Sequence, residues 1–128
     1  MASGPTIPPL RATIAEFVHA SAWRDLPSVV INIARQHLLD TIGCCLAATK
    51  VDTSRLLRTY LLAEGGAEQA TAMAMPRRLP MPQAAFRNGL LARRLEFDDM
   101  AMPDLHPAGV VVPTALAYRN ITAVQEQT

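Results

Sequence analysis

The sequence is poor in lysine and has no long apolar run, and each shortage argues against a class of protein. Lys50 is the only lysine beside eleven arginines, and the formal net charge of the 128 residues is +1. A nucleic-acid-binding surface would show a clustered excess of basic residues. No segment has the roughly 20 uninterrupted apolar residues of a membrane helix or the basic start of a signal peptide. We therefore expect a cytoplasmic protein with neither a nucleic-acid partner nor a membrane partner.

Cysteine is almost absent as well. Cys44 and Cys45 are adjacent, lie in an apolar stretch and do not form a CxxC spacing. Adjacent cysteines are poorly placed to bond to each other, so we expect reduced thiols in the core. A chain of 128 residues is one domain at most, with room for a modest core.

Apolar residues make up 50% of the chain, and they recur with helical spacing. An amphipathic helix is expected over residues 10–23. A second helix, apolar around much of its circumference, is expected over residues 27–48 and should be centrally buried. Its N-cap would be Asp25, with Pro27 in the first turn. A third helix would begin near Asp52 or Thr53 and stop at the glycines 65–66.

The second half of the chain is divided by proline. Residues 67–81 form a Pro-rich connector that we expect to be extended, with a short hairpin as the alternative. A fourth helix is expected from Pro82 to about residue 97, where Gly89 would permit a close helix crossing. A fifth would begin at Pro107, with a kink or late start at Pro113. The predicted fold class is therefore all-α, with about five helices.

A cluster of carboxylates lies between the last two expected helices. Glu96, Asp98, Asp99 and Asp104 stand directly before His106 in an otherwise sparsely charged chain. A loop held by rigid helices commonly carries reactive groups. The imidazole of His106 could exchange a proton, while unpaired backbone N–H groups at the start of the fifth helix could bind a substrate carboxylate.

Other interpretations of these residues remain open. The acidic residues could cap a helix in a solvated turn, with a structural histidine. A metal site built from Asp98, Asp99, Asp104 and His106 is a further alternative, although no ExxH or HxxxH pair supports it. Outside the cluster, we interpret His37, which lies on the apolar second helix, as a satisfied core or packing histidine. The neighbouring arginines 77 and 78 are a candidate carboxylate clamp or, more simply, part of a solvated turn.

Several stretches together resemble the N-terminal part of the MmgE/PrpD family. They are "DLPSVVINIARQHLLDTIGCCLAA", "EGGAEQAT", "RRLPMPQAAFRNGLLARRLEFDDM" and "HPAGVVVPTALA", in the family's order and within residues 12–117. The family includes 2-methylcitrate dehydratase, cis-aconitate decarboxylase and iminodisuccinate epimerase. The FDD and HP elements, preceded by the LLDTIGC helix, carry the resemblance.

The resemblance implies a mainly helical domain packed against a smaller α+β lid domain, in chains several times longer than this one. Residues 1–128 would then be a partial helical domain without the lid and the returning C-terminal segment. The family implies a homodimer that acts on small di- or tricarboxylates without a metal or other cofactor. The ending "YRNITAVQEQT" departs from the family pattern, so we expect a truncated or frame-disrupted chain, with a natural short paralogue as the alternative.

The resemblance also assigns roles to individual residues. His106 matches the histidine of the HP motif and is the expected catalytic residue. The expected substrate-binding residues are Glu96, where the family commonly has aspartate, the FDD pair Asp98 and Asp99, and Met100, where the family often has a hydroxyl residue. The family's second active-site histidine and its lysines have no counterpart here.

Two functions follow from this pattern. The first is a carboxylic-acid lyase, closest to 2-methylcitrate dehydratase, which we expect to be inactive as this chain alone because groups that hold carboxylates and exclude water are missing. The second is a helical interaction or self-association module without catalysis, since helices without a cover would expose apolar faces.

Overall fold

The computed structural model describes residues 9–101 and 104–125, and it is all-α as predicted. Its contacts divide the chain into two units, Met1–Ala34 and Arg35–Thr128, which are described separately. None of the helices among the described residues is long and apolar enough to cross a membrane. The elements, in order, are α1 (Leu10–Ala20), the short 3-10 helix η1 (Trp23–Asp25), α2 (Ser28–Ala48), α3 (Asp52–Glu64), α4 (Met81–Arg93) and α5 (Pro107–Gln125).

The first unit consists of α1, η1 and the start of α2. No residue of α1 is buried, and its apolar side chains, Phe17 among them, are exposed. The helix ends at Ser21, whose backbone N–H and hydroxyl both donate to the Phe17 carbonyl. Asp25 lies in η1, so it is not the N-cap of α2. The carbonyl of Pro27 instead accepts the first backbone bonds of that helix.

Only the last third of α2 is buried. Thr41, Cys44, Cys45 and Ala48 are covered, whereas the apolar side chains nearer the start of the helix are exposed. The prediction of a helix buried along its length is therefore wrong for its first half. A wide apolar circumference indicates that a helix can be covered on several sides, but it does not identify what covers it.

α3 and the connector behave largely as expected. α3 ends at Gly65 and Gly66, whose positive φ angles of 69° and 106° are easily reached only by glycine. No side-chain cap bond begins the helix; Asp52 lies in its first turn and pairs with Arg55. Farther on, Ala70 and Leu79 form an antiparallel bridge with two backbone hydrogen bonds of 2.9 Å. The connector thus has one isolated antiparallel bridge, and neither of its sides forms a strand among the described residues.

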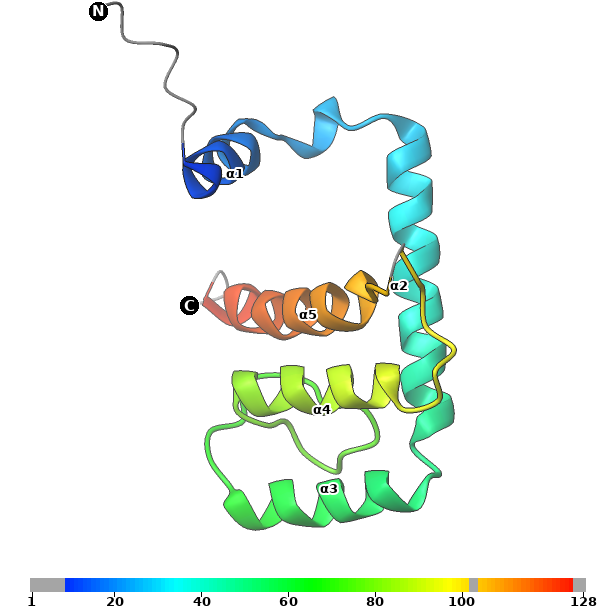
Figure 1. The fold of residues 1–128 in the computed structure, drawn as a ribbon. Coiled ribbons are helices and arrows are strands. Elements are labelled where there is room, and N and C mark those ends of the chain that lie inside the picture. Colours follow the sequence, from blue (N-terminus) through cyan, green and yellow to red (C-terminus); the bar gives the residue numbers. More distant parts are fainter. Residues whose placement is uncertain (1–8, 102–103, 126–128) are drawn as a thin grey trace, which may run out of the picture. The chain divides into compact units, whose positions relative to one another are not determined.

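α4 lies antiparallel to both α3 and α5 (Figure 1). It ends at Arg93, so the prediction of a helix reaching residue 97 is wrong. The chain leaves the helix through Glu96, which has a φ of 55°. The turn brings Glu96 and Asp98, three and five residues farther along the chain, onto the Arg93 guanidinium.

The crossing of α4 and α5 depends on glycine. A Cβ placed on Gly89 would lie 3.3 Å from the carbonyl oxygen of Gly109, so the predicted close crossing at Gly89 is confirmed. α5 begins at Pro107 as expected and continues through Pro113, so its start is not late. Pro107 has no N–H to leave unpaired at the first helical position.

Two buried clusters form the core of the second unit, and both consist mainly of small side chains. The first combines residues of α3, the connector, α4 and α5, and the second joins the end of α2 to α4. Close packing of small side chains brings helix backbones near one another. The members are Leu61, Ala70, Ala72, Leu79, Ala84 and Ala117 in the first cluster, and Cys45, Ala48, Leu91 and Ala92 in the second.

An arginine lies inside this unit. The Arg87 side chain is buried, its Nε donates to the Met73 carbonyl at 3.0 Å, and its NH1 donates to the Ser54 carbonyl at 3.3 Å. Burial, with a smaller effect of the Arg58 charge, lowers the pKa of Arg87. Arg87 thereby joins α4 to the connector and to α3.

Candidate active site

His106 and Asp98 are paired at the start of α5. The His106 Nδ1 lies 3.4 Å from the Asp98 Oδ2. The Asp98 side chain has no exposed surface, whereas 23% of the His106 side chain is exposed. An acid or base of this kind needs one accessible ring nitrogen and a defined orientation, and the pair provides a basis for both.

Arg93, the last residue of α4, binds the carboxylates of Glu96 and Asp98 in the loop that follows. Its NH1 donates to the Asp98 Oδ1 at 2.8 Å, and its NH2 donates to the Glu96 Oε2 at 3.0 Å. One guanidinium can serve two carboxylates because its donors form a rigid planar fork. Glu96 is 72% exposed at its side chain, so its carboxylate is open to solvent. Arg93 was not among the predicted site residues.

Asp99 serves the helix rather than His106. Its Oδ1 accepts the backbone N–H of Ala108 at 3.1 Å, in the first turn of α5. A carboxylate at this position is favoured by the unpaired N–H groups and the helix dipole. The backbone N–H at which we expected a substrate carboxylate is therefore already occupied by Asp99.

His37 lies on the other side of Asp99. Its Nδ1 is 3.8 Å from the Asp99 Oδ2, and its side chain is 42% exposed. His37 is therefore not a core residue, and its side chain lies next to the Asp99 carboxylate. The adjacent residues of the FDD motif thus have different histidine neighbours, His106 for Asp98 and His37 for Asp99.

The remaining members of the predicted cluster are exposed. Met100 has 67% of its surface exposed, and Asp104 is exposed as well. Within residues 9–101 and 104–125, no group of three or more His, Cys, Asp or Glu side chains is placed to hold a metal ion. Asp98, Asp99, Asp104 and His106 therefore do not form the alternative metal site in this arrangement.

Arg77 and Arg78 in the connector both donate hydrogen bonds to backbone carbonyls. Arg77 donates to the Leu62 carbonyl at 3.2 Å, and Arg78 donates to the Gln69 carbonyl and to the Asn120 Oδ1. Both residues are partly buried. They fix the connector against α3 and α5, and neither a carboxylate clamp nor a freely solvated turn describes them.

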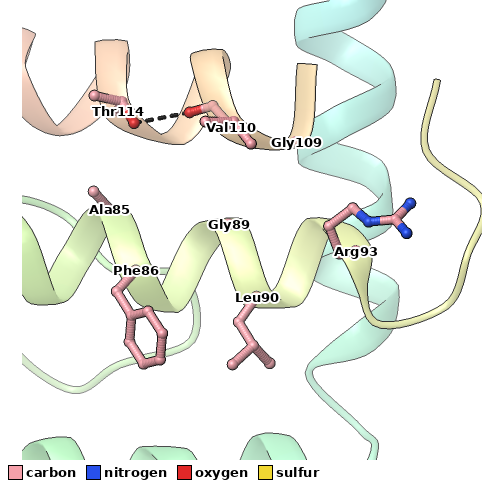
Figure 2. Close-up of a pocket in the computed structure, with 8 residues that line it drawn as sticks. All are labelled: Ala85, Phe86, Gly89, Leu90, Arg93, Gly109, Val110 and Thr114. Carbon is pink, nitrogen blue, oxygen red and sulfur yellow. Dashed lines mark hydrogen bonds between the residues drawn. The ribbon is translucent and has the colours of Figure 1, made fainter. Parts of the chain in front are cut away.

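An apolar pocket of about 410 Å³ lies between α4 and α5 (Figure 2). It adjoins the carboxylates of Glu96 and Asp98 through Arg93, which binds both of them. Arg93 stands at one end of the pocket, and its side chain extends away from the helix crossing. The Thr114 hydroxyl is used within its own helix, because it donates to the Val110 carbonyl at 2.8 Å. The pocket is lined by Ala85, Phe86, Gly89, Leu90, Arg93, Gly109, Val110 and Thr114.

The two cysteines are free and buried, as predicted. Burial is the largest influence on the Cys44 thiol, and the charges of Asp40 and Asp98 add to it; together they raise its pKa. Burial also raises the pKa of Cys45, to about 11. Both thiols therefore stay protonated near neutral pH and are poor nucleophiles.

Comparison with known proteins identifies the family. Residues 12–125 match the MmgE/PrpD N-terminal domain. The chain belongs to the MmgE/PrpD family. A cis-aconitate decarboxylase from Homo sapiens is 32% identical to it over 108 residues, and one from Mus musculus is 27% identical over 106 residues. Each alignment covers 82% of this MmgE/PrpD chain and 22% of the relative, so the chain spans about a fifth of the length of the curated relatives it matches.

Proposed function

We propose that this chain supplies part of the active site of an MmgE/PrpD lyase that acts on a small di- or tricarboxylate. His106 exchanges a proton with the substrate, and Glu96 and Met100 lie on the substrate side of the same loop. The observation that carries the proposal is the His106 side chain, which is 23% exposed and lies 3.4 Å from the buried carboxylate of Asp98. Family membership supports the reaction class.

Dehydration and decarboxylation of such a substrate both require the transfer of a proton to or from a carbon atom. In a dehydration, the base removes a proton from the carbon next to a carboxylate, and the hydroxyl on the neighbouring carbon leaves as water after it takes a proton from a general acid or from the protonated base. In a decarboxylation, the bond to carbon dioxide breaks, and the electron pair left on carbon takes a proton from the acid. One histidine can serve either reaction, as base in the first and as acid in the second.

The choice between these reactions is part of the proposal. The names of both relatives favour decarboxylation of cis-aconitate. Dehydration of 2-methylcitrate remains a prediction based on the resemblance of the sequence motifs. A cofactor-free homodimer in the cytoplasm is likewise a proposal, as is the substrate contact of Asp98 and Asp99, whose carboxylates have intramolecular partners here.

The experiment is thermal unfolding of the 128-residue chain, followed by circular dichroism, with and without millimolar cis-aconitate, 2-methylcitrate and citrate. A ligand that binds only the folded state raises its stability by about 2.7 kcal/mol at 100 times Kd. We expect one acid to raise Tm by several degrees, and the acid with the largest effect identifies the narrower reaction.

Matched histidine variants locate the binding site. The rise in Tm should disappear in His106→Ala and persist in His19→Ala, because His19 lies on the exposed helix α1. An equal rise in His106→Ala would contradict the assignment of the site. No rise with any of the three acids would contradict the proposed binding by this chain.

A second candidate, a helical self-association module, is favoured by exposed apolar side chains. Leu39, Leu56 and Phe97 are each more than two-thirds exposed. The candidate requires that such side chains form a contiguous apolar surface, because surfaces of that kind usually mark an interface. Sedimentation velocity over a range of concentrations tests it: a stable oligomer unaffected by carboxylates and by His106→Ala favours the module, and a monomer contradicts it.

A further inference from the structure

Two buried polar atoms without hydrogen-bond partners face each other beside α5. Neither the Asp98 Oδ2 nor the His106 Nδ1 has a hydrogen bond, and the two atoms are 3.4 Å apart. Buried polar atoms without a partner are rare, and each one calls for an explanation. A single proton held between these two atoms would satisfy both.

The Asp98 carboxylate is held in place from its other sides. Arg93 donates to the Oδ1 at 2.8 Å, which fixes which oxygen faces the histidine. Gly109 leaves room for the Oδ2, because a Cβ there would lie 3.1 Å from that oxygen and 3.3 Å from the Arg93 Cδ. The carboxylate therefore presents one defined oxygen to His106.

We infer that Asp98 is a positioning residue for His106: its Oδ2 accepts the Nδ1–H, so that the neutral ring carries its proton on Nδ1 and leaves Nε2 free to take a proton from the substrate. The role rests on the proposed function, since the tautomer matters for catalysis only if His106 exchanges protons. The 3.4 Å separation exceeds the roughly 2.7–2.9 Å of a charge-assisted bond, and catalytic hydrogen bonds are often long before the substrate binds.

Asp99 provides an internal comparison. It is adjacent in sequence, but its carboxylate accepts the Ala108 N–H and lies 3.8 Å from the His37 Nδ1. Removing the charge of Asp99 should therefore leave the Asp98–His106 pair intact. The same chain thus contains a matched carboxylate for the test.

The test is long-range proton–nitrogen NMR of the full 128-residue chain labelled with 15N-histidine, without any carboxylic acid added. The nitrogen shifts distinguish an Nδ1–H ring from an Nε2–H ring, and they are recorded at a pH where the imidazoles are neutral. We expect the Nδ1–H form for His106. The Nε2–H form in the unmodified chain would overturn the proposal without the need for any variant.

Variants then assign the cause. In Asp98→Asn the Arg93 donors take the amide oxygen, so the amide NH₂ faces the His106 Nδ1 and should switch the ring to the Nε2–H form. Asp99→Asn should leave the His106 signals unchanged. An Asp98→Asn chain that folds by circular dichroism and keeps the Nδ1–H form would overturn the proposal; if it does not fold, the unmodified chain still decides.

The result is independent of the carboxylate-binding experiment. A fixed Nδ1–H form together with melting that no acid changes would support the positioning by Asp98 and contradict the proposed function. A rise in Tm that depends on His106, together with the Nε2–H form, would support the function and overturn the positioning.

Discussion

The backbone N–H of Met73 donates to the Asn88 Oδ1 at 2.8 Å, and this bond joins the connector to the middle of α4. The Asn88 amide also donates to the Thr71 carbonyl at 3.0 Å. One buried side chain therefore pairs with the connector through both a donor and an acceptor, as a neighbouring strand would. At Thr71 and Met73 the backbone of the connector therefore has its hydrogen bonds with the Asn88 side chain and not with a neighbouring strand.

Replacement of Asn88 by alanine should lower the free energy of unfolding by about 2–3 kcal/mol. The change removes the hydrogen-bond partner of the Met73 N–H and of the Thr71 carbonyl, and the loss of each of these part-buried bonds costs about 1–1.5 kcal/mol. Urea unfolding followed by circular dichroism measures the loss. Thr71→Ala removes an exposed hydroxyl and its 3.0 Å hydrogen bond to the Asn120 Oδ1, and it should cost less, about 1 kcal/mol at most. Equal effects of the two variants would contradict the role of Asn88.

Two helix glycines should respond in opposite directions to alanine. Nothing lies within 4 Å of a Cβ placed on Gly43, so Gly43→Ala should stabilise the protein by up to about 1 kcal/mol. At Gly89 the new Cβ would lie 3.3 Å from the Gly109 carbonyl oxygen, and a helix backbone cannot readily move away. Gly89→Ala should therefore destabilise the protein. Thermal unfolding of both variants tests this prediction. Equal stabilisation would show that the helix crossing has room for a Cβ at residue 89 and would contradict the prediction.

The Cys45 thiol predicts a loss of stability at high pH. Burial, and secondarily Cys44, raises its pKa from 9.0 to about 11, so the folded state holds the proton where the unfolded state has released it. Its contribution is complete below pH 9.0 and is lost as pH rises toward 11. Urea unfolding at both ends of this window should show a fall that is smaller in Cys45→Ala. An identical fall in the variant would assign the effect to other groups.

The same burial should protect the thiols from alkylation. We expect iodoacetamide to react slowly with folded chain below pH 9.0 and rapidly with both cysteines in urea, as measured by mass spectrometry. Fast modification of Cys44 or Cys45 in the folded chain would contradict the buried, protonated state.

Asp99 should matter for stability more than Asp104 does. Asp99→Ala removes the acceptor for the Ala108 N–H at the start of α5, and loss of such a cap costs about 0.5–2 kcal/mol. Asp104→Ala, at an exposed site in the same loop, should cost less than about 0.5 kcal/mol. Urea unfolding of the two variants tests the difference, and the reverse order would contradict the capping role.

The elements that depend on local signals were predictable from the sequence. The glycines after α3 and the proline at the start of α5 end or begin helices through their own backbone restrictions, and both positions are confirmed. The end of α4 was not predictable in this way. The residues after Arg93 are good helix formers, and the turn at Glu96 depends on ion pairs that exist only once the loop is in place.

The candidate site was predictable as a cluster but not as a set of partners. Composition alone brought attention to His106 and the FDD pair. His37 is distant in sequence from Asp99, so that contact follows only from the tertiary structure. The partners of Arg93 are three and five residues away, but the chain must leave the helix for Asp98 to reach it, and nothing in the sequence around Arg93 indicates this. The FDD carboxylates have separate partners for the same reason, since Asp98 lies beside His106 whereas Asp99 accepts the Ala108 N–H and lies near His37.

Six of the ten residues in the two core clusters are alanine. An alanine side chain has little volume to remove. At these six positions every substitution except glycine adds atoms to a closely packed core. The sequence can therefore vary in only one direction at these positions, toward crowding. We expect random mutagenesis to find the interior of this chain intolerant of ordinary apolar exchanges, such as alanine to valine, that larger cores accept with ease.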